Sequence, residues 1–338
     1  MPLAYRVWPG KGLKTLKTEP ISHRQLMPHE VRVAVSQVSL NYRDLLICRG
    51  EYPAPSDHSI IPCSDGSGTV LEVGSNVTDF TIGDPVVGCF FADWQDGPPT
   101  REKVAISTGC NLDGWLAEEI ILPAKALVNI PSGLSLTTAA CAPCAGVTAW
   151  VALVELAKLT LGQTVLIQGT GGVSMWMAQL AKAHHINVIF ITSDAKKVEQ
   201  FNANILGVIN YHKNPDWSKE VLRLTNGRGA DLVLEVGGKS TIRESLRTVA
   251  FAGHIAIVGG LSGWTYDQVE YLELLTKLVT THGIYVGCKR SLIDLLAFTA
   301  KNSIAPYISA RFKFQDALSA FHEMEAGHHV GKIIIDIS

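Results

Sequence analysis

The chain has 338 residues, of which 47% are hydrophobic and 18% charged, with a formal net charge of -2. This length allows two domains with full cores, and the near-neutral charge gives no support for binding nucleic acid or an anionic membrane. No apolar run reaches the ~18 residues that span a bilayer, and residues 1–12 lack the apolar segment of a signal peptide, so we expect a cytoplasmic protein. The seven cysteines, an odd number, argue against a disulfide framework.

The first 125 residues or so are predicted to be rich in β-strands. Val31, Val33 and Val35 alternate along the chain, as on a half-buried strand. Short strands between glycine turns are expected in residues 64–74 and 82–88. Residues 91–109 are polar and contain prolines, which indicates a surface loop, and residues 139–158 are rich in Ala and Leu, which indicates a helix.

Residues 164–194 have the pattern strand, glycine-rich turn, helix, strand. A short apolar run over 165–167 fits a buried strand, the turn carries Gly169, Gly171 and Gly172, and apolar residues then recur at helical spacing before a second apolar run. A glycine-rich turn in this setting is typical of a dinucleotide-binding site.

Each glycine of the turn has a physical role. Gly169 permits the tight turn after the strand, and Gly171 lets the backbone approach a pyrophosphate, which the N–H groups of the helix N-terminus then bind. Ser174 replaces the third glycine of the fingerprint, and it is still small enough for the helix to pack on the strand. The predicted cofactor-binding residues of this turn are Gly169, Gly171, Gly172 and Val173.

Apolar strands alternate with helices after this unit, which predicts a parallel sheet covered on both faces. A helix is expected after Ser291, and the last strand, residues 332–337, is expected to return to the first domain. The other segments are strands over 208–211, 231–236, 254–260 and 283–287, and a helix over 217–224.

Several motifs together resemble one family along nearly the whole chain. They are LNYRDLLICRGEYP (40–53), SDGSGTVLEVG (64–74), IGDPVVG (82–88), CAGVTAW (144–150), GTGGVS (169–174), INY (209–211) and GKIIIDI (331–337). The chain resembles the medium-chain dehydrogenase/reductase superfamily, and most of all its zinc-independent, quinone-oxidoreductase-like branch.

The resemblance implies an α/β protein with two domains. Residues 1–125 and 289–338 would form a GroES-like, β-rich catalytic domain, and residues 126–288 a Rossmann domain with a doubly wound parallel sheet. The family also implies a cofactor in the cleft between the domains, a small-molecule substrate and a homodimer.

The resemblance also bears on metal. The zinc-ligand positions of the zinc-dependent members fall on Asn41, Ser64 and Cys144, and an amide and a hydroxyl do not replace a thiolate and an imidazole. No structural zinc lobe is expected either, so we predict no bound metal. Cys141 and Cys144 form a C-x-x-C, which is either a redox dithiol or, as we favour, a packing feature.

The choice of cofactor depends on the end of the second strand of the nucleotide-binding unit. The resemblance places Ser193 nearest the ribose 2′ group and Lys197 and Tyr211 where the family contacts a 2′-phosphate, which favours NADPH. Lys197 could instead be a solvated charge and Tyr211 a residue that covers the sheet. A shift of one position would bring Asp194 to the ribose and favour NADH.

Without zinc, no Lewis acid polarises a simple carbonyl, so a quinone or an α,β-unsaturated carbonyl is the expected substrate. Asn41 can donate a hydrogen bond to the developing enolate, and Tyr52 matches a proton donor of related enoyl reductases, although it could instead pack on the substrate. We expect Arg43 and Asp44 to be structural.

Two other functions stay open from the sequence: an alcohol dehydrogenase of the same superfamily, and an NADPH-binding protein with little turnover. The loops at 91–109 and 264–271 are expected to shape the substrate pocket.

Overall fold

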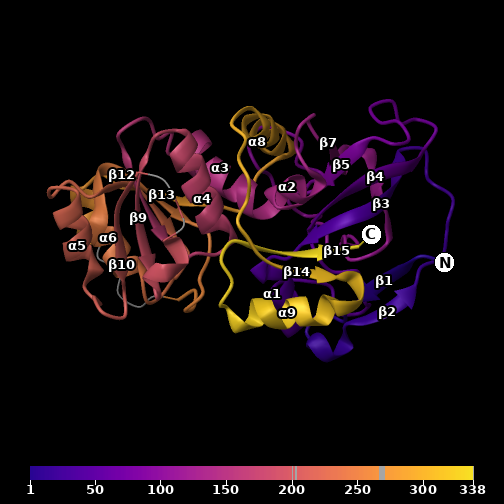
Figure 1. Cartoon of the computed structure of the whole chain (residues 1–338), viewed down its shortest axis with the longest axis horizontal. Helices are drawn as coiled ribbons and strands as arrows, with labels where there is room; N and C mark the ends of the chain where they lie inside the picture. The colour runs from indigo at the N-terminus through magenta and orange to yellow at the C-terminus, as the bar shows by residue number, and fades with distance from the viewer. Residues whose placement is uncertain (200, 202–203, 266–270, 338) are drawn as a thin grey trace. The chain divides into compact units, whose positions relative to one another are not determined.

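The computed structural model describes residues 1–199, 201, 204–265 and 271–337. Their contacts divide the chain into two compact units, of which one comprises Met1–Val147 and Val286–Ser338 and the other Thr148–Tyr285 (Figure 1). In the part of the chain so described, no helix is long and apolar enough to cross a membrane. The predicted loop at 264–271 lies largely outside the described residues.

The first unit is built on a sheet with the strand order β14-β15-β3-β4-β5-β7, in which β6 also pairs with β3. The last strand joins the N-terminal part of the chain here, because β15 pairs antiparallel with β3 and sets Ile335 opposite Val38. The strands are β3 (Glu30–Ser39), β4 (Asp65–Val73), β5 (Pro85–Gly88), β6 (Glu119–Pro123), β7 (Leu127–Asn129), β14 (Ile308–Lys313) and β15 (Lys332–Asp336), beside a ribbon of β1 (Leu3–Arg6) and β2 (Lys17–Pro20).

Helices α1 (Tyr42–Arg49), α2 (Leu136–Ala140), α8 (Lys289–Lys301) and α9 (Ala317–Ala326) belong to the same unit. Strand β7 pairs with β5, and the Ser67 hydroxyl on β4 donates to the Leu136 carbonyl at 2.7 Å. Residues 126–147 therefore pack with the first unit, whereas the expected domain boundary at residue 126 assigned them to the nucleotide-binding domain.

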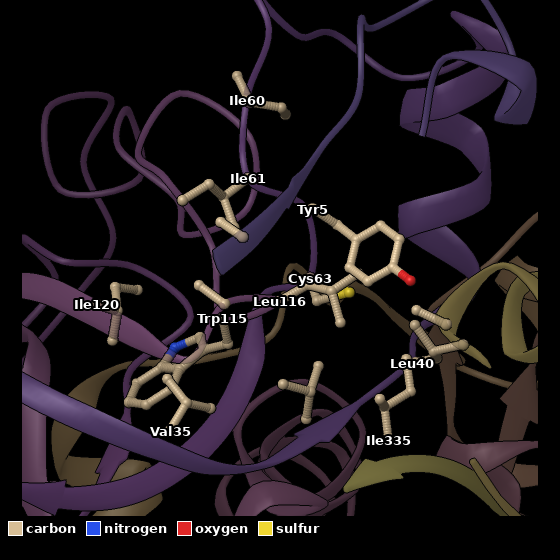
Figure 2. Close-up of a cluster of buried hydrophobic side chains, with 14 of the residues drawn as sticks. Tyr5, Val35, Leu40, Ile60, Ile61, Cys63, Trp115, Leu116, Ile120 and Ile335 are labelled. Carbon is tan, nitrogen blue, oxygen red and sulfur yellow. The ribbon is translucent and has the colours of Figure 1, made fainter. Parts of the chain in front are cut away.

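Trp115 lies at the centre of the first unit's core and is fully buried. Figure 2 shows its indole in the cluster that also contains Val35 and Ile120. Two glycines on neighbouring strands leave room for the ring: an added Cβ would lie 2.5 Å from the Trp115 side chain at Gly66 and 2.6 Å from it at Gly88.

The second unit is the predicted doubly wound parallel sheet, with the strand order β10-β9-β8-β11-β12-β13. Strands β8 to β10 extend to one side and β11 to β13 to the other, so the order reverses between β8 and β11, where such sheets bind ligands. The strands are β8 (Thr164–Gln168), β9 (Asn187–Thr192), β10 (Ile205–Asn210), β11 (Ala230–Glu235), β12 (Val249–Ile257) and β13 (Thr280–Gly283), with helices α4 (Gly172–Ala183), α5 (Trp217–Leu224), α6 (Ile242–Thr248) and α7 (Tyr271–Thr276).

Two predicted elements differ from the structure. The prediction of a strand at 283–287 is wrong, because β13 ends at Gly283 and the apolar residues that follow Gly283 in the sequence lie outside the strand. The helix expected at 139–158 is interrupted, since π-helical turns at Ala142–Gly146 and Val151–Leu156 flank the short α3 (Val147–Trp150).

Candidate active site

A chain of buried polar side chains crosses the first unit where β3, β4 and β15 meet. Asn41 follows β3 and begins α1, Ser64 and Asp65 stand at the start of β4, and Lys332 is the first residue of β15. The antiparallel register of β15 on β3 sets Ile334 opposite Ser39, and the Leu40 N–H donates to the Ile333 carbonyl. This register brings Lys332 to Asn41.

From Lys332 to Asp65, each side chain donates a hydrogen bond to the next. The Lys332 ammonium donates to the Leu40 carbonyl at 2.7 Å and to Asn41 Oδ1. Asn41 Nδ2 then donates to Ser64 Oγ at 3.2 Å, and the Ser64 hydroxyl donates to Asp65 Oδ1 at 2.8 Å. The other oxygen of Asp65 accepts from the Cys144 N–H at 3.0 Å. The structure thus connects Asn41, Ser64 and Cys144.

Asp44 fixes the start of α1 beside this chain. Its Oδ2 accepts the Asn41 backbone N–H at 2.8 Å, a capping contact that agrees with the structural role expected of Asp44. Burial raises the pKa of the Asp44 carboxyl to about 6, although the Arg43 guanidinium opposes the shift. Within the described residues, Asp44 Oδ1 has no hydrogen-bond partner.

Tyr52 lies beyond the other end of α1, half-buried and next to Arg43. The Arg43 guanidinium carbon is 5.1 Å from the centre of the Tyr52 ring and 4.5 Å from that of Phe90. The same guanidinium donates to the Thr108 carbonyl at 2.9 Å and to Ser107 Oγ at 2.8 Å. Arg43 thus connects Tyr52 to the loop of residues 91–109, which supports the expected structural role of Arg43.

The glycine-rich turn of the second unit has the geometry of a phosphate cradle. Gly169 has a φ of 69°, a left-handed conformation that favours glycine, and Gly171 is the residue before α4. A Cβ added at either position would meet no heavy atom within 4 Å, so both face open space. Gly172 and Val173 form the first turn of α4, whose N–H groups can bind a pyrophosphate.

Ser174 performs the packing expected of the third position of the fingerprint. It is buried, and its hydroxyl donates to the Gln168 carbonyl at 2.7 Å, which ties the first turn of α4 to the end of β8.

Ser193 and Tyr211 lie side by side at the carboxyl ends of β9 and β10. The parallel register pairs Thr192 with Asn210, and Asn210 Nδ2 donates to the Ser193 carbonyl at 2.7 Å. Lys197 follows on the short helical turn Ala195–Val198. This turn is capped by Asp194, whose carboxylate accepts the Lys196 N–H at 3.0 Å.

Two family models match the chain: an alcohol dehydrogenase GroES-like domain at residues 27–132 and a zinc-binding dehydrogenase domain at 172–301. A zinc-type alcohol dehydrogenase-like protein of Schizosaccharomyces pombe is 36% identical over 335 residues, which are 96% of each protein. The chain belongs to the medium-chain dehydrogenase/reductase superfamily.

Further relatives agree with this membership. A quinone oxidoreductase-like protein 2 homolog of Nematostella vectensis is 30% identical over 96% of this chain and 86% of that protein. The crystal structure of a putative alcohol dehydrogenase from Sinorhizobium meliloti 1021 superposes with a TM-score of 0.92 at 34% identity, covering 100% of this chain and 99% of the other. This medium-chain dehydrogenase/reductase is therefore an oxidoreductase, and the expected α/β class, with a GroES-like and a Rossmann domain, is confirmed.

The description of one family model as zinc-binding raises the question of a metal. The zinc-ligand positions hold an amide, a hydroxyl and a thiol, and the Lys332 ammonium already donates to the amide oxygen of Asn41. Burial and the nearby Asp65 carboxylate raise the pKa of the Cys144 thiol. Among the described residues, no group of three or more His, Cys, Asp or Glu side chains could hold a metal ion. This donor set does not fit catalytic zinc.

The C-x-x-C pair of this medium-chain dehydrogenase/reductase has thiols of low reactivity. Burial raises the pKa of Cys141 to about 11, and Ser39 Oγ donates to its sulfur at 3.8 Å. Cys144 is shifted in the same direction. Because both thiols stay protonated at neutral pH, the packing role is favoured over a redox dithiol.

Two buried charged residues, Lys332 and Glu235, were not predicted from the sequence. Glu235 lies at the end of β11, and its carboxylate accepts hydrogen bonds from Gln168 Nε2 and from the Gly238 N–H, both at 2.8 Å. Glu235 thus ties the ends of β8 and β11 together. The available signal was a charged residue at the end of an otherwise apolar strand, as in GKIIIDI and DLVLEV.

Proposed function

We propose that this protein is a zinc-independent, NADPH-dependent oxidoreductase that reduces quinones or α,β-unsaturated carbonyls. The observation that carries the proposal is the Lys332–Asn41–Ser64 chain, which holds the Asn41 amide in one orientation. Asn41 occupies a zinc-ligand position of the zinc-dependent members, so an amide donor replaces a ligand of the Lewis acid that a simple carbonyl would need. Relatives support this class: a quinone oxidoreductase-like protein 2 of Bos taurus is 29% identical over 339 residues, and an acryloyl-coenzyme A reductase of Sulfurisphaera tokodaii is 26% identical over 315 residues.

The side chains of the first unit suit this chemistry. When bound, NADPH supplies a hydride to the conjugated double bond. Negative charge then develops on the substrate oxygen and needs hydrogen-bond donors. Asn41 Nδ2 gives one N–H to Ser64, and its second N–H has no partner within the described residues, so it can donate to that oxygen. The Tyr52 hydroxyl is the proposed proton donor.

The proposed preference for NADPH is supported by three residues of the second unit. Ser193 and Tyr211 are neighbours through the Thr192–Asn210 register, and Lys197 supplies a positive charge on the next turn. Asp194, the acid that would favour NADH, has one carboxylate oxygen engaged in capping that turn.

We further propose a cytoplasmic homodimer. In the described residues, β13 is an outer strand of its sheet, and Phe251 on the paired strand β12 and Leu275 on α7, which precedes β13, are largely exposed. An exposed strand edge with apolar neighbours is suited to pairing with a second copy.

Three assays on one preparation of known metal content test the reaction class. They measure reduction of a quinone by NADPH, reduction of an enone by NADPH, and oxidation of simple alcohols. We expect reduction of the quinone or the enone, no alcohol oxidation and no stoichiometric zinc.

Tyr52→Phe should lower turnover roughly 10²–10⁴-fold if the hydroxyl donates the proton.

Tyr42→Phe, on an exposed tyrosine of α1, is the matched control and should leave turnover unchanged. A protein that contains about one zinc per chain and oxidises alcohols but leaves quinones and enones alone would be an alcohol dehydrogenase. Binding of NADPH without any turnover would support the binding-protein alternative. Equal activity of Tyr52→Phe and wild type would reject Tyr52 as proton donor.

A further inference from the structure

We infer that Lys332 is a positioning residue of this reductase: its ammonium holds the Asn41 amide in one orientation and strengthens the N–H that Asn41 offers to the substrate. The catalytic part of this inference rests on the proposed function. The orientation of the amide rests only on the hydrogen bonds of the first unit.

The ammonium of Lys332 has little contact with solvent, since the residue is 2% exposed. Burying a lysine is costly unless its charge finds good partners. The partners here are the Leu40 carbonyl and Asn41 Oδ1, both at the junction of β3 with α1. The placement follows from the pairing of β15 with β3, which makes Lys332 a fixed part of the sheet.

The identity of the donors determines which way the Asn41 amide points. An ammonium can only donate, so the atom of Asn41 that it contacts must be the oxygen. Nδ2 must then face Ser64, whose hydroxyl accepts from Asn41 and donates to Asp65. Asp65 is itself held by the Cys144 N–H. A flipped amide would set its NH₂ group against the ammonium.

The charge of Lys332 also acts through the amide. A cation on the oxygen side of an amide draws electron density from the nitrogen, and hydrogen bonds in a buried chain reinforce one another. The second N–H of Asn41 becomes a stronger donor toward a developing oxyanion. A buried positive charge therefore assists the reaction without touching the substrate.

A double-mutant cycle tests this coupling. Turnover of an enone or quinone is measured for wild type, Asn41→Ala, Lys332→Met and the double variant. We expect Asn41→Ala to cost roughly 10²–10³-fold and Lys332→Met roughly 10–100-fold in kcat, with cofactor affinity unchanged. In the Asn41→Ala background, Lys332→Met should cost almost nothing more, because its effect requires the amide.

Lys277→Met is the matched control, because the Lys277 ammonium likewise donates two hydrogen bonds, here to the Leu246 and Arg247 carbonyls of the second unit at 3.2 and 2.8 Å. It should leave kcat unchanged. Multiplicative losses in the cycle would show that Lys332 acts independently of Asn41 and would overturn the inference.

A spectroscopic measurement separates this inference from the proposed function. In ¹⁵N-labelled wild type, the Asn41 side-chain amide proton that is donated to Ser64, assigned by its loss in Asn41→Ala, should exchange slowly with solvent. Lys332→Met should speed this exchange if that variant folds, because the amide is no longer held in one orientation. If wild type reduces neither quinones nor enones, the proposed function fails while the amide signals still decide the positioning role. Rapid solvent exchange of this proton in wild type would overturn the positioning role whether or not Lys332→Met folds.

Discussion

The 2′-phosphate is what distinguishes NADPH from NADH, and Lys197 is the cation that we propose binds it. Its neighbours in the site are already arranged by the backbone, because Ser193 and Tyr211 follow paired residues on β9 and β10. A charge-assisted hydrogen bond to a phosphate contributes about 1.5–3 kcal/mol. The preference of the enzyme for one cofactor should therefore depend strongly on this one side chain.

Lys197→Ala should raise the KM for NADPH roughly tenfold or more and leave the KM for NADH nearly unchanged. Steady-state kinetics with both cofactors at saturating acceptor measure the two effects. Lys196→Ala is the control, since Lys196 is exposed on the same short turn and its backbone N–H bonds to Asp194. Equal losses with NADPH and NADH would show that Lys197 does not read the 2′ group.

The partners of buried charged residues could not be predicted from the sequence. Lys332 stands out in GKIIIDI as a charge at the start of an apolar strand, but its partners depend on the pairing of β15 with β3. That register joins residues almost 300 positions apart, at a separation of 291 for Lys332 and Asn41. No local pattern specifies such a pairing, so the role of Asn41 could be proposed from the sequence while its orientation could not.

At the scale of elements, β4 and β5 depend on glycines that make room for Trp115. Gly66 does not have a left-handed φ, so its conformation alone would tolerate a side chain. The obstacle is steric, because an added Cβ would lie 2.5 Å from the indole, closer than any normal contact. Relief requires a shift of either the strand or a fully buried tryptophan.

Gly66→Ala should lower the free energy of unfolding by about 1–3 kcal/mol, the usual cost of overpacking a core. Urea denaturation of variant and wild type measures the change. Gly283→Ala is the control, because that strand glycine in the second unit has no heavy atom within 4 Å of an added Cβ. Stability unchanged in Gly66→Ala would mean that the core around Trp115 is loosely packed.

The sequence predicted elements best where apolar residues recur at a regular spacing and worst at the edges of the sheets. Helix α5 was expected at 217–224, and its bounds are Trp217–Leu224. Strand β13 was misplaced because its residues, Thr-Thr-His-Gly, are polar and mostly exposed on the outer strand of the described sheet, whereas the apolar IYV that follows is not in the strand. Hydrophobic periodicity detects burial rather than backbone pairing, and an edge strand has little burial to detect.

At the scale of the whole molecule, the polar chain of the first unit joins four distant parts of the sequence. Asn41, Ser64 with Asp65, Cys144 and Lys332 meet only after β3, β4, β15 and the π-helical turn after α2 have assembled. Forming this cluster buries charge, which costs stability unless every group is paired. Asp44 is the group where this cost should be measurable, because one of its oxygens has no partner within the described residues.

The pH dependence of unfolding should reveal this cost. Burial raises the pKa of Asp44 to about 6 in the folded chain, against roughly 3.9 for an exposed aspartate. The folded state thus binds this proton more tightly than the unfolded state does. The stabilising contribution is complete below about pH 4 and is lost as the pH rises through about 6. The loss is of the order of 3 kcal/mol.

Asp44→Asn cannot ionise, and its amide oxygen can still accept the Asn41 N–H, so the variant should escape this loss. Its free energy of unfolding relative to wild type should rise between about pH 4 and 7 and then level off. Denaturant titrations of both proteins across this range measure the difference. Asp57→Asn is the control, because Asp57 is exposed and its pKa is lowered by His58, so no such rise should appear. The difference in unfolding free energy between Asp44→Asn and wild type could instead stay constant with pH. Asp44 would then titrate as an exposed carboxylate does, and the polar cluster would be better solvated than its burial indicates.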